Sequence, residues 1–226
     1  MFIETKYIYL KSHPLFSELD EVKLMELSAL AKVYTLYRGE TASYGDGDYS
    51  KIYFVVKGKI KIAEANEMGE ELIKDILTQG DLFGDISLHG DSSLDEYAQA
   101  LTANTIICGF NVGDFRRILQ ANPMLALSYA GKVNSKLQKV EARHSDLVFR
   151  DAKSRLIRFM KYWANMDGNR VGDKIVLNNY LTHSDIAGFI STSRQSVNVL
   201  LNELRDSGML HYNRQKIELN DSFTWN

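Results

Sequence analysis

Residues 183–210 read HSDIAGFISTSRQSVNVLLNELRDSGML, and this stretch decides the fold of the C-terminal part of the chain. Thr182 and Asp185 have the spacing of a capping box, in which a hydroxyl and an acidic side chain close the first turn of a helix. Thr192 and Gln195 have the same spacing and predict the start of a second helix. Two short helices separated by a tight turn are therefore expected.

Apolar residues recur at helical spacing in both of these helices and give each a face to bury. They are Ile186, Ala187 and Ile190 in the first helix and Val197, Leu200, Leu201 and Leu204 in the second. Such a pair forms a helix-turn-helix, whose second helix places its N-terminal residues in the major groove of DNA. After Gly208, the segment MLHYNRQKIELN predicts two short strands around residues 213–215, which would form a wing.

Polar residues occupy the face of the second helix that the apolar stripe leaves free. Arg194 can donate two hydrogen bonds to guanine, and Gln195 or Asn198 can pair with adenine. Hydroxyls and helix-terminal amides nearby can bind phosphates without reading sequence. The candidates for this role are Thr182, Ser184, Ser193 and Ser196. Double-stranded DNA is therefore the expected partner, and a helical hairpin with no DNA role is the alternative.

Composition narrows the class of protein. The chain has 226 residues, of which 45% are hydrophobic, enough for one large or two modest globular domains. Neither a signal peptide nor an apolar run long enough to span a bilayer is present, so a soluble, cytoplasmic protein without membrane contact is expected. Cys108 is the only cysteine, which excludes an internal disulfide and a cysteine-held metal site within one chain.

Charge is unevenly distributed along the chain. The formal net charge is −2, but from Arg150 onward 11 Lys and Arg stand against 8 Asp and Glu. The remaining residues hold 16 basic side chains of the total 27 and 21 acidic ones of the total 29. This asymmetry is consistent with a basic surface on the C-terminal part.

The first half of the chain has the pattern of an antiparallel β domain. Residues 14–31 predict short helices, with Ser17 and Asp20 as candidate caps. From Val33 onward, short β-rich segments alternate with Gly, Asn and Asp turns, and several of the glycines are expected at positive φ. Asp114 is predicted to open a helix, and Asn122-Pro123 to end it and start another.

A long helix is predicted to follow, with an apolar stripe that repeats every four and three residues. The stripe consists of Ala126, Ala130, Val133, Leu137, Val140, His144 and Leu147. This is the seam of a two-stranded coiled coil, and charged neighbours keep it narrow, so a homodimer is expected. Packing of the stripe on its own domain is the alternative. Residues 149–151 are predicted to form the hinge into the last domain.

In this order, the β domain, heptad helix and winged helix-turn-helix resemble the cyclic AMP receptor protein and fumarate-nitrate reductase regulator (CRP/FNR) family of bacterial transcription factors. The resemblance rests on four stretches. They are GDYSKIYFVVKGKIKI (47–62), QGDLFGDISL (79–88), ANP (121–123) and TSRQSVNVLLNELRDSGML (192–210). It implies an α+β chain with a cyclic-nucleotide-binding-like β-roll (jelly roll) sensor over 1–122, a dimerisation helix over 123–149 and a winged helix-turn-helix over 150–226.

The resemblance also assigns roles in DNA recognition. It places Arg194 at the family's guanine-reading arginine, and Ser193 and Ser196 at phosphate or sugar contacts. Gln195 stands where many members have Glu, and Val199 where cyclic AMP receptors have another Arg, so a different operator sequence is expected. In the turn, Ser191 replaces a frequent glycine.

The effector site departs further from the cyclic-nucleotide binders. Their Gly-Glu pair, which touches the ribose, corresponds to Gly84 and Asp85. The arginine that neutralises their cyclic phosphate falls on Asp95 or Glu96, with Tyr97 beside them. A carboxylate repels a phosphate and lacks the donor fork of an arginine, so no physiological cyclic AMP binding is expected.

The remaining pocket positions agree with that expectation. The family's adenine-contacting Thr-Ser pair falls on Val140 and Glu141. His89 and His144 are candidate haem ligands, but a lone His is more often a packing or surface residue, and no cofactor is predicted. An unidentified small-molecule effector, or none, is left open, as is a contact with RNA polymerase.

Two other classes of function compete with a DNA-binding regulator. A cyclic-nucleotide-binding regulatory module would need the phosphate-binding arginine and no DNA reader. An enzyme would need a catalytic motif, and the chain has no P-loop, nucleophile elbow or HExxH. A homodimeric, sequence-specific DNA-binding transcriptional regulator that reads a near-palindromic operator is therefore the predicted function.

Overall fold

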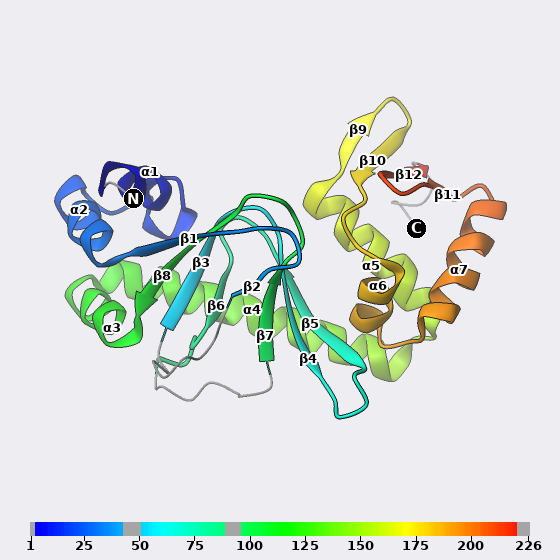
Figure 1. The fold of residues 1–226 in the computed structure, drawn as a ribbon, viewed down its shortest axis with the longest axis horizontal. Helices are drawn as coiled ribbons and strands as arrows, with labels where there is room; N and C mark the ends of the chain where they lie inside the picture. Colours follow the sequence, from blue (N-terminus) through cyan, green and yellow to red (C-terminus); the bar gives the residue numbers. More distant parts are fainter. Residues whose placement is uncertain (1–2, 43–50, 89–95, 221–226) are drawn as a thin grey trace. The chain divides into compact units, whose positions relative to one another are not determined.

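The computed structural model describes residues 3–42, 51–88 and 96–220 of the chain (Figure 1). The fold divides into two compact units, Met1–Lys139 and Val140–Asn226. The long helix α4 (Pro123–Phe149) contributes to both. Helices and antiparallel sheets occur in each unit, as an α+β fold requires. Because α4 crosses the boundary, division of the chain at 122 and 149 remains a proposal about functional parts.

Two four-stranded antiparallel sheets form the centre of the first unit, with the orders β1-β8-β3-β6 and β2-β7-β4-β5. The strands are β1 (Lys32–Leu36), β2 (Thr41–Ala42), β3 (Lys51–Lys57), β4 (Ile60–Ala65), β5 (Glu71–Leu77), β6 (Leu82–Gly84), β7 (Glu96–Ala100) and β8 (Thr105–Asn111). The helical elements are α1 (Ile3–Lys11), the short η1 (Pro14–Phe16), α2 (Glu21–Leu30) and α3 (Val112–Ala121). The predicted antiparallel β domain is confirmed.

Strand β3 is buried on both faces, which explains why its sequence is an unbroken apolar run. Successive side chains of a strand point to opposite faces. Ile52 and Phe54 pack with the helices on one face of the sheet, while Tyr53 and Val55 pack against the second sheet on the other. Because both faces are covered, polar alternation is lost. Burial, followed by nearby Tyr34, raises the pKa of Tyr53 to about 12.

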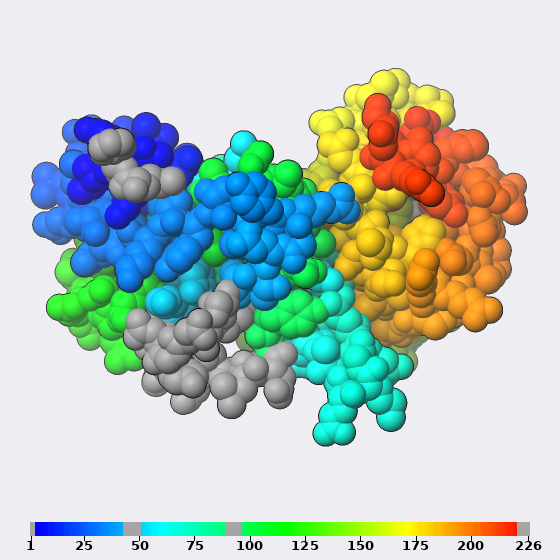
Figure 2. All heavy atoms as spheres, viewed as in Figure 1, coloured from blue at the N-terminus to red at the C-terminus, as the bar shows by residue number. Residues whose placement is uncertain are grey.

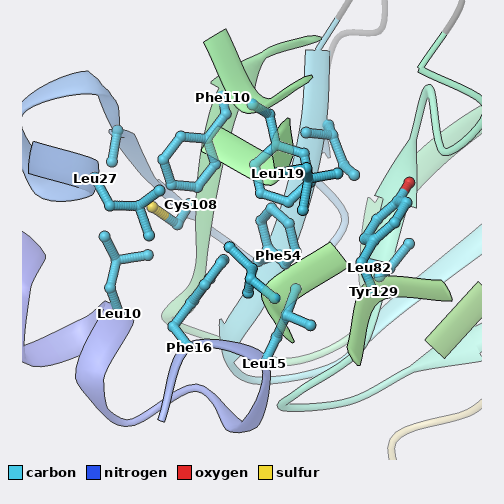
Figure 3. Packing of buried hydrophobic residues seen from close by; sticks show 14 of the residues in the cluster. Leu10, Leu15, Phe16, Leu27, Phe54, Leu82, Cys108, Phe110, Leu119 and Tyr129 are labelled. Carbon is cyan, nitrogen blue, oxygen red and sulfur yellow. The ribbon is translucent and has the colours of Figure 1, made fainter. Parts of the chain in front are cut away.

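The larger hydrophobic cluster fills the space between this sheet, the N-terminal helices and the first turns of α4 (Figure 3). Phe16, Phe54 and Phe110 form its aromatic centre, with ring centroids 5.0 to 6.2 Å apart. Cys108 lies in the same cluster with none of its surface exposed, and burial raises the pKa of its thiol to about 12. The thiol is therefore packed as an apolar group.

Tight turns connect the strands. Five of the glycines expected at positive φ adopt it, namely Gly39, Gly58, Gly69, Gly80 and Gly84, whereas residues 45, 47 and 90 lie outside the described ranges. At Gly84 a Cβ would approach the Lys51 carbonyl oxygen to 2.4 Å, so the backbone packing itself requires glycine there.

Some helix boundaries in the first unit agree with the sequence, whereas α1 was not predicted and the start of α3 was misplaced. Asp20 caps α2 by accepting a hydrogen bond from the Lys23 amide at 2.9 Å, and Asn122-Pro123 separates α3 from α4. The prediction that Asp114 opens a helix is wrong. Asn111 caps α3 by accepting from the Gly113 amide, because its short side chain already reaches the free N–H groups of that turn.

The first turns of α4 pack against the β domain. Ala126 and Val133, two members of the predicted seam, are half-buried on the hydrophobic cluster. Further along, Lys136 lies 3.9 Å from a carboxylate oxygen of Asp75. Burial raises the pKa of Asp75, and Lys136 opposes that shift. The N-terminal part of the seam therefore packs on its own unit. This agrees in part with the alternative prediction, in which the stripe packs on its own domain.

The second unit is built on α5 and a small antiparallel sheet with the order β11-β12-β10-β9. Its elements are α5 (Ala152–Asp167), β9 (Asn169–Val171), β10 (Lys174–Asn178), α6 (His183–Ile190), α7 (Arg194–Asp206), β11 (Leu210–Tyr212) and β12 (Lys216–Asn220). Helix α4 ends at Phe149 and Asp151 caps α5, so one helix gives way to the next at residues 149–151. The two compact units divide between Lys139 and Val140, and the hinge at 149–151 stays a prediction. The predicted helix pair and the two strands of the wing are present as well.

Candidate functional site

The N-terminus of α6 is closed by the predicted capping box. The Thr182 hydroxyl oxygen accepts a hydrogen bond from the Asp185 amide at 3.0 Å, and an Asp185 carboxylate oxygen accepts from the Thr182 amide at 2.8 Å. The Thr182 hydroxyl also donates to that carboxylate at 2.6 Å. Its hydrogen is therefore engaged within the protein, whereas the neighbouring Ser184 side chain is exposed.

The turn between α6 and α7 is left-handed at one residue. Ser191 has φ 53° and ψ 62°, the conformation for which glycine is the usual choice. The Arg155 guanidinium, from α5, donates to the Ile190 carbonyl at 2.8 Å, to the Ser191 carbonyl at 3.2 Å and to the Arg150 carbonyl at 2.7 Å. One cation thus satisfies carbonyls at the end of α6, in the turn and in the link between α4 and α5.

Helix α7 begins one residue later than the sequence predicted. Ser193 is the cap, accepting from the Ser196 amide at 3.0 Å, and the two hydroxyl oxygens lie 2.9 Å apart. The prediction that Thr192 and Gln195 form a capping box is wrong. The Thr192 amide instead donates to the Ala187 carbonyl, so Thr192 belongs to the closure of α6.

The first turns of α7 present the expected polar face. Val197, Leu201 and Leu204 are buried, and Arg194 and Gln195 on the other side are exposed. Within the described parts of the chain, neither Arg194 nor Gln195 has a recorded hydrogen bond or ion pair. Val199 is 52% exposed on the same helix. Helix α7, orange in Figure 2, lies at the surface of its unit.

Asn198 is the exception among the predicted readers. It is half-buried, and its Oδ1 atom is hydrogen-bonded to Nδ1 of His183, the first residue of α6. The His183 ring packs edge-on against Tyr212 of β11, with centroids 5.8 Å apart. The Tyr212 hydroxyl donates to Oδ1 of Asn202 at 3.1 Å. Sequence reasoning missed these contacts because they join segments that are far apart in the chain.

A second arginine fixes the end of α4 to the helix pair. The Arg143 guanidinium donates to the Phe189 carbonyl at 2.6 Å and lies 4.2 Å from the centre of the Phe189 ring. The cation–π contact and the hydrogen bond both hold the same residue of α6, Phe189. No local sequence pattern indicates this pair, because the two residues are 46 positions apart.

The residues predicted for a cyclic-nucleotide pocket begin at the end of β6. Gly84 has φ 88°, and the following Asp85 is 3% exposed. The Ser87 hydroxyl donates to an Asp85 carboxylate oxygen at 2.7 Å. The Tyr129 hydroxyl of α4 donates to the Ile86 carbonyl at 2.6 Å, and burial, followed by Asp85, raises the pKa of Tyr129. This segment is therefore held in place by side chains of its own unit.

The predicted phosphate position is occupied by paired charges. Glu96 lies 3.2 Å from Nζ of Lys74, which also contacts Glu64 at 2.6 Å. The Tyr97 hydroxyl donates to Glu71, whose other oxygen is 2.7 Å from Nζ of the buried residue Lys61. Asp95 lies outside the described residues.

The other candidate effector residues lie on α4 or outside the described ranges. Val140 and Glu141 belong to the second unit and are exposed, as is His144. His89 is outside the described residues. Among residues 3–42, 51–88 and 96–220, no three His, Cys, Asp or Glu side chains gather as metal ligands. No helix in these ranges combines the length and apolar character needed to cross a bilayer.

Two family models match the chain. Residues 36–122 match the cyclic nucleotide-binding domain, and residues 154–222 match the Crp-like helix-turn-helix domain. The first match covers most of the two-sheet region, and the second covers the unit that contains α6 and α7.

Similar proteins extend over nearly the same length. The chain is 26% identical to a global nitrogen regulator from Nostoc sp. (strain PCC 7120) over 85% of this chain and 86% of that protein. It is 24% identical to the cAMP-activated global transcriptional regulator CRP of Pasteurella multocida, over 70% and 76%. The solved structure of a CooA mutant from Carboxydothermus hydrogenoformans has the same fold, with a TM-score of 0.71, 24% identity and coverage of 90% and 87%.

The fold, the helix pair and these matches agree on one family. A cyclic-nucleotide-binding domain precedes a Crp-like helix-turn-helix, in the order that the sequence indicated. The chain therefore belongs to the CRP/FNR family of transcriptional regulators and carries that family's DNA-binding helix-turn-helix.

Proposed function

We propose that this chain acts as a homodimer that reads a near-palindromic DNA operator through Arg194 and Gln195 and responds to an effector other than cyclic AMP. The observation that carries the proposal is the first turn of α7, where both side chains are exposed and have no recorded partner in the described structure. An arginine without an acidic neighbour can form the bidentate bond to guanine that gives sequence preference.

The residues around that turn supply contacts to the DNA backbone. Ser184, Ser193 and Ser196 place hydroxyls at the starts of α6 and α7, where helix-terminal N–H groups also favour phosphate. Thr182 has its hydroxyl hydrogen engaged with Asp185, so in our proposal it positions α6 rather than donating to a phosphate. Val199 offers an apolar contact, for example to a thymine methyl group.

Dimerisation follows from the exposed apolar side of α4. Leu137 and Val140 are each 54% exposed and Leu147 is 40% exposed, in the four-three spacing of a coiled-coil seam. Burying such a stripe against a second copy removes apolar surface from water. Two copies of α7 would then enter successive major grooves, about 34 Å apart on the DNA.

The pocket chemistry supports an effector other than cyclic AMP. Cyclic-phosphate binding needs a free cation, but Lys74 is shared by Glu64 and Glu96, and Lys61 is paired with Glu71. Entry of a phosphate here would add negative charge beside carboxylates, which is repulsive. The effector in this proposal is a small molecule of another kind. A haem-dependent regulator with His89 or His144 as the ligand is the alternative, and the proposal includes no catalytic step.

The test is a selection from random duplex DNA with purified protein at a stated salt concentration, with and without cyclic AMP. Enrichment of one palindrome in both arms is expected. Arg194→Ala should lose the preference at one base pair in each half-site while keeping the spacing. Enrichment that requires cyclic AMP would overturn the effector assignment, and equal loss by Arg194→Ala on selected and random DNA would overturn the reading role.

A further inference from the structure

A continuous set of side-chain contacts joins α6, α7 and the wing strand β11 in the second unit. Asn198 and Asn202 lie one turn apart on α7, where residues four apart share a face. Asn198 bonds to His183 of α6, the His183 ring packs on Tyr212 of the wing, and Tyr212 bonds back to Asn202. The set therefore returns to the helix from which it starts.

The contact to His183 fixes how the Asn198 amide is oriented. An amide oxygen only accepts hydrogen bonds, so Nδ1 of His183 must carry the hydrogen in this contact. With Oδ1 turned towards the imidazole, the two N–H donors of the amide are left for other partners. Tyr212 limits rotation of the imidazole because it packs against the ring edge-on.

We propose that His183 is a positioning residue that holds Asn198 as a hydrogen-bond donor towards the base edges. This inference rests on the proposed function, in which α7 enters the major groove. A donor favours guanine O6 and N7, adenine N7 and thymine O4, and it disfavours the cytosine amino group. Free to rotate, an asparagine can turn its oxygen outward and accept from cytosine. His183 thus narrows the bases that Asn198 tolerates.

The test compares operator motifs selected from random duplex DNA by five proteins. Wild type and Asn198→Ala together identify the base pair that Asn198 reads. His183→Phe keeps a ring beside Tyr212 but removes the donor, and His183→Gln restores a donor. His211→Phe is the matched control, because His211 is an exposed histidine of the same strand β11 as Tyr212.

His183→Phe is expected to reduce the discrimination against cytosine at that base pair by about tenfold, within the range of a good base contact, and to leave the Arg194 position unchanged. His183→Gln should recover the wild-type motif, and His211→Phe should match it. The inference is overturned if His183→Phe selects the wild-type motif, if it weakens all positions equally, or if Asn198→Ala changes no position. Failure of wild type to select any motif would refute the proposed function itself.

Discussion

Arg155 should be the side chain on which the stability of the DNA-binding unit depends most strongly outside its apolar core. Its guanidinium donates to the carbonyls of Ile190, Ser191 and Arg150 at 2.8, 3.2 and 2.7 Å. These carbonyls belong to a helix end, a turn and the short link between α4 and α5, which have few other ways to pair their backbone groups. Arg155→Met keeps most of the apolar stem and removes all three donors.

The size of the effect follows from the number of bonds. A hydrogen bond contributes roughly 1 kcal/mol net, and more when the donor is charged and buried. Because Arg155 is half-buried, water can reach part of the site after substitution, so we use the lower figure. Three bonds then predict a loss of about 3 kcal/mol in the free energy of unfolding of this unit.

Denaturant unfolding followed by tryptophan fluorescence measures this loss. Trp163 is fully buried in α5 of the same unit, and in a Trp225→Phe background it is the only tryptophan. Arg158→Met is the matched control, because Arg158 makes one exposed ion pair to Asp146, expected to contribute below about 1 kcal/mol. Equal shifts for Arg155→Met and Arg158→Met would refute the reasoning.

Three further perturbations test other features. Ser191→Gly removes a side chain from a left-handed position (φ 53°) and should raise the stability of the second unit by up to about 1 kcal/mol in the fluorescence assay, whereas a loss would contradict strain there. Burial, followed by Lys132, lowers the pKa of His13 from 6.5 to about 4. Between pH 6.5 and pH 4, His13 is therefore protonated in the unfolded chain but neutral in the folded chain. The free energy of unfolding, which is highest above pH 6.5, should fall by about 3 kcal/mol as the pH is lowered to 4. His13→Asn should flatten this acid limb in unfolding experiments across that range, and an unchanged slope would count against it. Leu137→Glu should convert a dimer to a monomer in sedimentation, while Val22→Glu, at an exposed position of α2, should not. A wild-type monomer at micromolar concentration would disprove the dimer.

Local patterns in the sequence were sufficient to predict most of the fold. The capping box of Thr182 and Asp185 depends on residues three apart, and the buried stripe of α7 repeats at helical spacing, so both could be inferred without tertiary contacts. The error at Thr192 has a tertiary cause. Its amide closes α6 on Ala187, which leaves Ser193 as the next residue free to cap α7.

The contacts that position the site could not be inferred in the same way. Arg155 is 35 residues from the carbonyl of Ile190, and Arg143 is 46 residues from that of Phe189. In the sequence, both arginines have the pattern of surface charges on amphipathic helices. Their partners are backbone carbonyls, which every residue has, so no particular residue type marks the contact. The pairing of Asn198 with His183 was hidden for a related reason, since an amide and an imidazole are each common in the first turns of a helix without being paired.

Burial of the single cysteine makes the chain suited to site-specific labelling. Thiol reagents attack the thiolate, and with a pKa near 12 and no exposed surface, Cys108 should stay unmodified while the first unit is folded. A cysteine introduced at exposed Asp206, at the C-terminal end of α7 and away from the reading turn, would then be the one site for a maleimide dye, with no background mutation needed. A fluorophore there would report operator binding and, between the two copies of a dimer, the distance between recognition helices in solution.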